Sequence, residues 1–261
     1  YGGYTAGLGN ATNNTVAFKN TFAMNYVFVT GGASGQGNAT GNTILLAGNN
    51  STGNLDVTGG SSSNVSADVR TGNRLQVQGK LNGVRAIRNF EKMQFDLDSS
   101  VASGDIMLSV DSGHFGTQTF DWSNIKVTGA STWRPNEEGS KRVILYSGPA
   151  LTLNNYNVAS SRHVAGNYEY GLNTSAGMPA VSTVNATEIY FDRNQFKNAN
   201  IEYKAGKPMP ATGAVYAGTS TMGSTVTNNT LTIEGQDITY RTFYGGYTAG
   251  LGNATNNTVA F

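Results

Sequence analysis

The chain repeats itself at two distances, and the shorter distance constrains its fold most. Residues 1–18, YGGYTAGLGNATNNTVAF, return unchanged as residues 244–261, which is 243 positions further on. At the opening end, GNATNNT (9–15) is followed by GNATGNT (37–43), 28 positions on and without a gap. A gapless period of this size is typical of proteins built from stacked structural turns.

The 28-residue frame places residues of one type in fixed columns, which we expect to form ladders along the stack. Because the two ends are one sequence, columns from both ends join through it. The glycine ladder is Gly3, Gly31, Gly59, Gly218 and Gly246. The asparagine ladder is Asn14, Asn42, Asn229 and Asn257, and the threonine ladder is Thr15, Thr43, Thr230 and Thr258. We expect glycine to supply positive φ at corners and stacked asparagine amides to hydrogen-bond along the axis.

Between these columns, short apolar segments indicate strands. Apolar residues are expected to alternate inward in TVAF (15–18), TILLAG (43–48) and LTIEG (231–235). Alternation with period 2 is typical of half-buried strands, and the many β-branched residues argue against a flexible linker. The sequence therefore predicts an all-β fold, a β-solenoid, with a right-handed β-helix as its expected form.

The frame divides the chain into three stretches. Residues 1–85 and 215–261 keep regular turns in the 28-residue frame, the latter repeating the opening stretch. Residues 86–214 lose the frame, yet segments such as DIMLSV and RVILYSG still indicate strands. We interpret this middle as irregular turns with longer loop excursions.

Composition excludes several functional classes. With 17 basic and 16 acidic residues, the chain offers no electrostatic argument for binding nucleic acid. There is no cysteine, which removes thiolate chemistry. No apolar run approaches the roughly 20 residues of a membrane helix, so we expect no membrane insertion of this segment.

The histidines and aspartates form no pattern in the sequence that is typical of a metal site or a catalytic site. His114 and His163 lie in no metal-binding spacing, and we expect turn or surface positions for both. Asp96, Asp98 and Asp105 could be calcium ligands or hydrolytic carboxylates, but DLDSSVASGD departs from the calcium-loop pattern. We therefore expect no catalytic residue, no metal, no cofactor and no enzymatic activity.

Tyrosine gives the chain its candidate contact residues. Five tyrosines are expected at corners of the regular turns: Tyr1, Tyr4, Tyr216, Tyr244 and Tyr247. An outward ring could contact a sugar or a partner protein, or it could stack on a ring of the next turn. Trp122 and Trp133 are expected in the core and at a turn.

Two segments carry a family resemblance. The Tyr-Gly-Gly corner followed by GNATNNT and an apolar strand resembles the passenger regions of large bacterial autotransporter-type adhesins. So does ASGDIMLSV (102–110), which follows IRNFEKMQFDLD (87–98). The resemblance implies a right-handed β-helix or similar solenoid displayed outside the cell for adhesion, aggregation or spacing. We expect the parts that serve secretion to lie elsewhere in the gene.

Three functions follow, in decreasing order of expectation. The first is a structural repeat unit of a bacterial extracellular surface fibre, a stalk or filament segment whose partners are further copies placed end to end. The second is an adhesive module that binds surface glycans or proteins through the irregular middle. The third is a β-helical carbohydrate enzyme, which the sparse charges disfavour.

Overall fold

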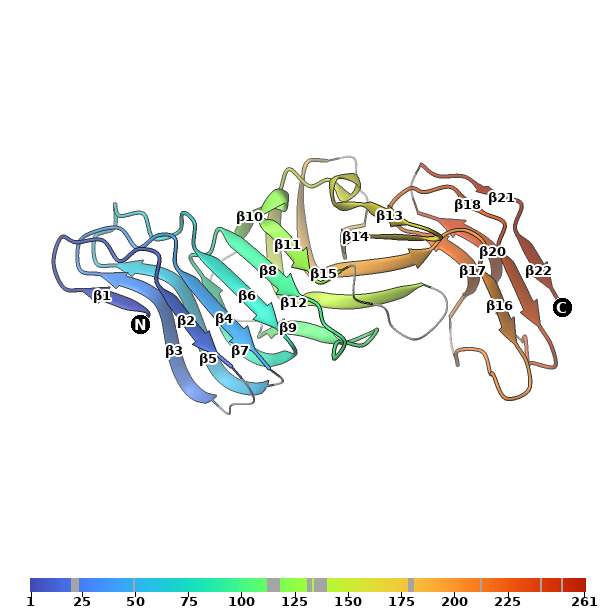
Figure 1. The fold of residues 1–261 in the computed structure, drawn as a ribbon, viewed down its shortest axis with the longest axis horizontal. Helices are drawn as coiled ribbons and strands as arrows, with labels where there is room; N and C mark the ends of the chain where they lie inside the picture. Colours follow the sequence, from blue (N-terminus) through green and yellow to red (C-terminus); the bar gives the residue numbers. More distant parts are fainter. Residues whose placement is uncertain are drawn as a thin grey trace. The chain divides into compact units, whose positions relative to one another are not determined.

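The structure is a computed structural model that describes residues 1–19, 24–48, 50–111, 118–130, 133, 140–177, 181–211, 213–239, 241–249 and 251–261. About 55% of the chain is strand and 3% is helix. Stacked parallel coils form a β-solenoid of about 8 turns, which confirms the predicted fold class (Figure 1). The hand of the coil stays a prediction.

Within the described residues, the regular elements are strands of 2 to 14 residues and two 3₁₀ helices. The strands of the first half are β1 (Gly3–Thr5), β2 (Thr15–Phe18), β3 (Met24–Ser34), β4 (Thr43–Ala47), β5 (Asn50–Ser62), β6 (Arg74–Gln78), β7 (Leu81–Arg88), β8 (Lys92–Asp96), β9 (Ile106–Val110), β10 (Thr119–Asp121) and β11 (Ile125–Thr128). Those of the second half are β12 (Lys141–Asn154), β13 (His163–Ala165), β14 (Tyr168–Thr174), β15 (Thr183–Gln195), β16 (Asn200–Tyr203), β17 (Val215–Ser220), β18 (Val226–Thr227), β19 (Thr230–Ile233), β20 (Phe243–Thr248), β21 (Ala254–Thr255) and β22 (Thr258–Ala260). The 3₁₀ helices are η1 (Trp122–Asn124) and η2 (Val158–Ser161). Within the described ranges, no helix has the length and apolar character needed to cross a bilayer.

The chain divides into two compact units, each assembled from segments distant in sequence. The first unit comprises Tyr1–Arg134, Val143–Tyr156 and Thr174–Tyr190. The second unit comprises Pro135–Arg142, Asn157–Asn173 and Phe191–Phe261. All crossings between the units therefore fall in the stretch 86–214, where the 28-residue frame is lost.

The first unit contains two parallel sheets, because each coil adds one strand to each. One sheet has the order β1-β3-β5-β7-β9-β12, and the other has the order β2-β4-β6-β8-β11 (Figure 1). The side chains that point inward from these strands are fully buried, as at Ile44, Leu55, Leu75 and Phe95. Burial of such aliphatic and aromatic side chains supplies the main stabilisation of the stack.

Coil length explains where the sequence periodicity ends. Asn14 and Asn42, which hydrogen-bond across successive coils, are 28 residues apart, and Asn42 and Asn73 are 31 residues apart. The next coil is much shorter, because β6 pairs with β8, whereas the step from Asp96 in β8 to Thr128 in β11 again takes 32 residues. Strand pairing is preserved while the loops change length, so a gapless comparison of the sequence cannot follow the coils beyond the second.

In the second unit, two successive coils match strand for strand. The strands β17, β18 and β19 pair in parallel with β20, β21 and β22, and this step keeps the 28-residue frame. Phe243 and Val259 of the last coil pack against a core of six buried side chains that precede it in the sequence: Ala199, Ile201, Val215, Ala217, Leu231 and Ile233. The pair β13 and β14 departs from this pattern, because it is an antiparallel hairpin.

A left-handed residue precedes the ladder asparagine in each regular coil. Asn13 has a φ of 57°, and Asn256, the equivalent residue in the closing copy, has a φ of 54°. Gly41 holds the same position in the second coil, with φ of 68°. Asparagine and glycine are the residues that adopt this conformation at least cost, which explains why only these two types occupy this corner.

Candidate functional site: the repeated coil and its ladders

The asparagine ladder forms as predicted in the first unit and extends one coil further. The backbone N–H and Nδ2 of Asn14 donate to Oδ1 of Asn42, at 3.0 and 2.9 Å. The same two groups of Asn42 donate to Oδ1 of Asn73, at 2.8 and 3.1 Å. The 28-residue frame does not predict Asn73 as a ladder residue, because Asn73 follows Asn42 by 31 residues.

The second unit repeats this geometry. The backbone N–H and Nδ2 of Asn229 donate to Oδ1 of Asn257, at 3.1 and 2.8 Å. The ladder amides also reach backbone carbonyls of the preceding coil, as Nδ2 of Asn257 does with Val226 O at 3.0 Å. In the first unit, Nδ2 of Asn42 does the same with Ala11 O at 3.1 Å. The amides thus bind backbone groups that face the interior, where an unpaired polar group is costly.

The glycine ladder needs a correction of register in the first unit. Gly3 pairs with Gly32, and Gly32 pairs with Gly60, so Gly31 and Gly59 lie one residue before the column of Gly3. The cause is the loop between the two strands of a coil. Thr5 pairs with Ser34 and Thr15 pairs with Thr43, so this loop is one residue longer in the first coil than in the second. In the second unit, Gly218 pairs with Gly246 as predicted.

The reason for glycine in this column also differs from the prediction. None of the five predicted ladder glycines has positive φ. Instead, a Cβ on Gly3, Gly218 or Gly246 would overlap the side-chain amide of the ladder asparagine beside it. A Cβ on Gly31 would lie 2.6 Å from the carbonyl oxygen of Gly59. Close approach of an amide or a backbone therefore selects glycine here.

The threonine ladder is confirmed at both ends. Thr15 pairs with Thr43, and Thr230 pairs with Thr258. The column does not continue as threonine, because Arg74 follows Thr43 in the next coil of the first unit.

The five tyrosines lie on the outer surface, on or beside strands and not at corners. In the second unit, the rings of Tyr216 and Tyr244 stack with centroids 5.1 Å apart and planes 11° apart. Tyr247 flanks both rings, at 5.4 and 5.8 Å. Burial, together with the two neighbouring tyrosines, raises the pKa of Tyr216.

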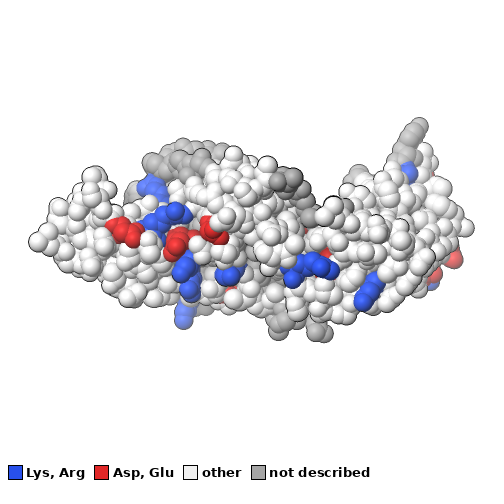
Figure 2. All heavy atoms as spheres, turned by 90° about the horizontal axis from the view of Figure 1, so that it is seen from above, with Lys and Arg blue, Asp and Glu red and all other residues white. Residues whose placement is uncertain are grey.

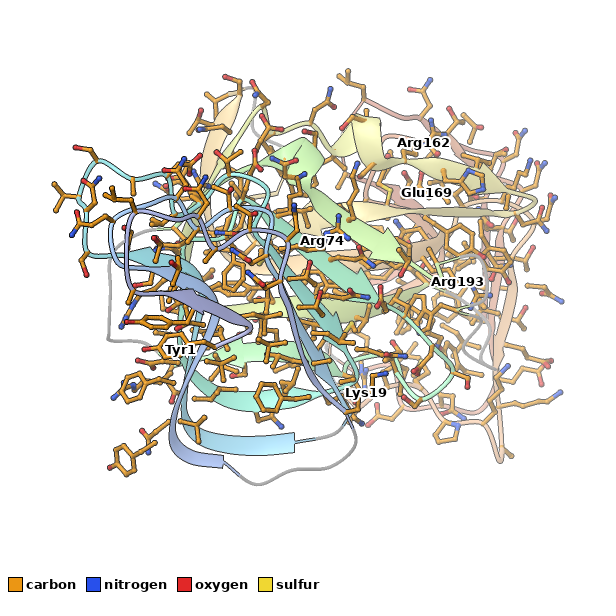
Figure 3. The ribbon with its side chains drawn as sticks, turned by 60° about the vertical axis from the view of Figure 1, so that its left-hand side comes forward. Tyr1, Lys19, Arg74, Arg162, Glu169 and Arg193 are labelled. Carbon is orange, nitrogen blue, oxygen red and sulfur yellow. The ribbon has the colours of Figure 1, made fainter. Side chains whose placement is uncertain are left out.

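The equivalent pair in the first unit is more open. Tyr1 and Tyr4 have centroids 5.8 Å apart and are 78% and 67% exposed, against 38% and 41% for Tyr244 and Tyr247. Figure 3 shows Tyr1 on the outside of the strands. Ring stacking between coils and outward exposure, the two interpretations left open by the sequence, thus occur together.

A buried polar network in the second unit was not foreseen. Glu169 is fully buried and accepts hydrogen bonds from Asn194 Nδ2 at 3.0 Å and Ser224 Oγ at 2.5 Å. Nε of Arg162 lies 3.4 Å from the same carboxylate, and the two side chains are labelled in Figure 3. These residues come from three segments far apart in the chain, and no local motif signals their meeting.

The network continues at Asp192, which is also buried. Nε and Nη2 of Arg142 donate to its two oxygens at 2.6 and 2.8 Å. Thr221 Oγ1 donates to Asp192 at 2.9 Å and accepts from Asn194 at 2.6 Å, which joins the two carboxylates into one network. A buried carboxylate is tolerated when it is paired and hydrogen-bonded in this way.

A further ion pair lies on the outer face of the first unit. Nε and Nη2 of Arg85 donate to the two oxygens of Asp56 at 2.7 and 2.5 Å, and Arg88 lies 3.6 Å away. The hydrogen bonds from Arg85 hold the pKa of the Asp56 carboxyl below its ordinary value, although burial opposes the shift. Elsewhere charge is sparse, and the face shown in Figure 2 is mostly uncharged.

The residues considered for catalysis or metal binding stay apart. Asp96 accepts from Gln76 and Gln94, whereas Asp105 pairs with Lys80 at 3.1 Å. His163 is exposed on β13, and His114 lies outside the described residues. In the described part of the chain, no three His, Cys, Asp or Glu side chains form a group that could hold a metal ion.

The two tryptophans lie in the core, as expected. Trp122 is 2% exposed and packs edge-on against Tyr156 with centroids 4.8 Å apart. Trp133 is 1% exposed and its Nε1 donates to Val101 O at 2.9 Å. Neither offers an open aromatic platform for a sugar.

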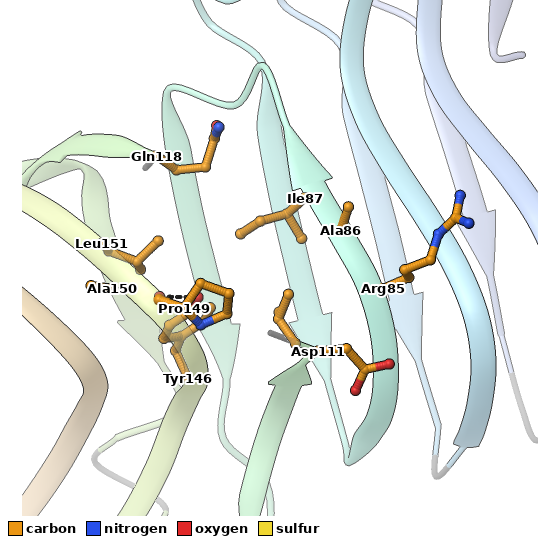
Figure 4. A pocket seen from close by; sticks show the side chains of 10 residues that line it. Arg85, Ala86, Ile87, Asp111, Gln118, Tyr146, Pro149, Ala150 and Leu151 are labelled. Carbon is orange, nitrogen blue, oxygen red and sulfur yellow. Dashed lines mark hydrogen bonds between the residues drawn. The ribbon is translucent and has the colours of Figure 1, made fainter. Parts of the chain in front are cut away.

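A small cavity lies between β7 and β12 in the first unit (Figure 4). Ile87, Tyr146 and Leu151 line it, with Arg85 and Gln118 at its rim. The Tyr146 hydroxyl donates to Pro149 O at 2.7 Å. The volume of about 30 Å³ holds about two water molecules and is far too small for a sugar ring.

Comparison with known proteins gives no match. No protein-family model, no curated protein and no solved structure matches the sequence. The function is therefore inferred from the geometry of the repeated coil.

Proposed function

We propose that this chain is a structural repeat unit of a bacterial extracellular surface fibre, a stalk or filament segment in a tandem array. The observation that carries the proposal is that one coil sequence occurs twice with opposite faces covered. Residues 1–18 have the following coil stacked on them, through β3 and β4. Residues 244–261 have the preceding coil stacked on them, through β17, β18 and β19. A coil with the next repeat attached would be covered on both faces.

In each unit, a column of inward-pointing side chains includes a valine of the repeated stretch. In the first unit one inward column runs through Val16, Ile44, Leu75, Met93 and Ile125. In the second unit the corresponding column runs through Ile201, Leu231 and Val259. Val16 and Val259 are the same position of the repeated stretch, so a tandem array makes the two columns one. The asparagine ladders join in the same way at Asn14 and Asn257.

The proposed location rests on the family resemblance of the sequence to surface adhesins. The surface composition agrees with such a role, since the face shown in Figure 2 carries few charges. Protease treatment of intact cells tests the location directly. Release of peptides from residues 1–261 without lysis supports display on the surface, and peptides released only after lysis contradict it.

A chain lengthened by one period tests the stacking. Residues 19–261 are appended directly after Phe261, and amide hydrogen exchange is followed at residues 251–261 of the first period. We expect Ala254 and Asn257 to exchange slowly in the lengthened chain, because their N–H groups gain partners in the next coil. In the chain of one period they exchange fast under dilute conditions. Equal exchange in the two chains would contradict the proposal.

A second function, adhesive contact with glycans or proteins, is favoured by the outer tyrosines. Tyr244 and Tyr247 combine stacking with 38% and 41% exposure, which leaves ring faces available to a ligand. Beads that carry the chain, and beads that carry the variant with Tyr216, Tyr244 and Tyr247 all changed to Ser, are compared for cell attachment. Loss of attachment with unchanged circular dichroism supports a contact role.

A further inference from the structure

We propose that separate copies of this chain also join head to tail, with residues 244–261 of one copy stacked on residues 1–18 of the next. The inference rests on the proposed function, because it uses the same seam. It adds a polarity and a set of contacts between unlinked copies. Its basis is that the two faces of the repeated coil have complementary hydrogen-bonding groups.

The face toward the following coil presents both donors and acceptors, and among the acceptors are Thr5 O and Asn14 O, which accept from Gly35 and Thr43 of that coil. In the opening copy, Ala11 N–H reaches Asn38 O in the following coil at 2.8 Å. The backbone N–H and Nδ2 of Asn14 reach Asn42 Oδ1. Ala254 and Asn257 occupy these two positions in the closing copy and therefore direct the same groups outward from the last coil.

The face toward the preceding coil presents the matching acceptors. In the closing copy, Asn253 O accepts from Val226 N–H at 2.7 Å, and Asn257 Oδ1 accepts from Asn229. Asn10 O and Asn14 Oδ1 occupy the same positions in the opening copy. Donors also point this way. Thr258 N–H reaches Asn229 O and Ala249 N–H reaches Ser220 O, both at 2.8 Å, and Thr15 N–H is the counterpart of the first.

Stacking the last coil of one copy on the first coil of another satisfies every one of these groups. Ala254 N–H meets Asn10 O, the Asn257 donors meet Asn14 Oδ1, and Thr15 N–H meets Asn257 O. The two faces of the coil carry their donors and acceptors at different positions, so this pairing requires the last coil of one copy to meet the first coil of the next. A head-to-tail contact of this kind does not close on itself and builds filaments.

The side chains fit the same arrangement. Tyr1 of the next copy stacks on Tyr244 as Tyr244 stacks on Tyr216, whose rings are 5.1 Å apart. Val16 covers Val259 as Val259 covers Leu231. The stretch thus stacks on itself in register, as identical strands do in cross-β assemblies.

Two proline variants block one face each. Thr15→Pro removes the N–H that points toward the preceding copy, and Ala254→Pro removes the N–H that points toward the following copy. Thr15 is the first residue of β2 and Ala254 is the first residue of β21, and both are edge strands. Proline is tolerated at the first residue of an edge strand whose N–H faces away from its partner. Should Thr15→Pro alter folding, Val16→Asp blocks the same face by placing a charge in the apolar column.

Sedimentation velocity of the full chain tests the proposal over a range of concentrations. We expect the wild type to form species that grow with concentration, and each variant alone to stay at the 27.4 kDa of the single chain. In a mixture, the free last coil of Thr15→Pro meets the free first coil of Ala254→Pro. The mixture should therefore form a dimer and stop there.

The repeat supplies matched controls. Thr258→Pro and Ala11→Pro make the same changes in the same sequence, but they remove bonds within the chain, from Thr258 to Asn229 and from Ala11 to Asn38. We expect both to lower the melting temperature, whereas Thr15→Pro and Ala254→Pro keep it.

Three results would overturn the inference: a wild type that stays monomeric, single variants that assemble as the wild type does, or a mixture without dimers. The lengthened chain separates these failures from failure of the proposed function. Protected Ala254 and Asn257 amides in that chain with a monomeric single-period chain would leave the tandem array standing and remove only the association of separate copies.

Discussion

Asn14 donates both its backbone N–H and its Nδ2 to the same oxygen, Oδ1 of Asn42, and Asn229 does the same to Asn257. The Asn42 side chain therefore accepts two hydrogen bonds from the coil before it, and Asn42 donates two hydrogen bonds to the coil after it. Because every rung depends on the next, the ladder fixes the register of successive coils at the place where the strands themselves turn a corner.

Replacing the central rung tests what the ladder contributes. Asn42→Ala leaves the donors of Asn14 and the carbonyl of Ala11 without their partner in a buried site, so we expect a loss of about 2–4 kcal/mol in the free energy of unfolding. Asn10→Ala is the control, since Asn10 accepts one exposed bond from Asn38, and it should cost at most about 0.5 kcal/mol. Urea unfolding measures the free energy of unfolding of both variants. Equal losses would show that the ladder asparagine contributes no more than an exposed one.

Glycine beside the ladder should be intolerant of any side chain. In Gly218→Ala the new Cβ overlaps the amide of Asn229, and we expect a loss of about 1–3 kcal/mol. Gly7→Ala is the matched control, because a Cβ there meets no atom within 4 Å and its φ is not positive. Gly7→Ala should leave the melting temperature unchanged or raise it, and a similar drop for both variants would contradict the close-approach explanation.

The ion pair of Asp56 with Arg85 should make stability depend on pH in the acid range. The pKa of Asp56 is lowered in the folded state, so its contribution is present above the unfolded pKa of about 3.9 and is lost as pH falls through the folded value. We expect Asp56→Asn to lower the free energy of unfolding at pH 7 by about 1–3 kcal/mol. Denaturation at pH 7 and pH 3 should show a smaller acid-induced loss for Asp56→Asn than for the wild type. Parallel acid losses in the two proteins would assign the pH dependence to other groups.

The buried network should be far more sensitive than a surface pair. Glu169→Gln removes the charge that faces Arg162 and an acceptor for Ser224, and we expect a loss of about 2–4 kcal/mol with faster amide exchange at residues 168–173. Glu202→Gln is the control, since Glu202 forms an exposed pair with Lys204 and should cost at most about 0.5 kcal/mol. An unchanged Glu169→Gln would mean that the network is structurally neutral.

Much of the architecture was predictable from the sequence because identical coils require identical columns. The 28-residue frame located the asparagine and threonine ladders, and the alternation in TVAF and LTIEG located β2 and β19. The frame failed where loops change length. It missed Asn73, 31 residues after Asn42, and placed Gly31 in the column that belongs to Gly32.

The sequence by itself determined that the chain is a stack of β-coils with polar ladders, since periodicity, strand patterning and corner residues are all local properties. Only the tertiary structure decided which residues those coils bring together over long distances. Glu169, Asp192 and Ser224 share one buried network because coils of unequal length align them, and no sequence spacing records that alignment. The same holds for the reason behind Gly3 and Gly218: an amide from another part of the coil occupies the space of a Cβ. Local periodicity fixes the kind of coil, and packing between coils fixes what each residue touches.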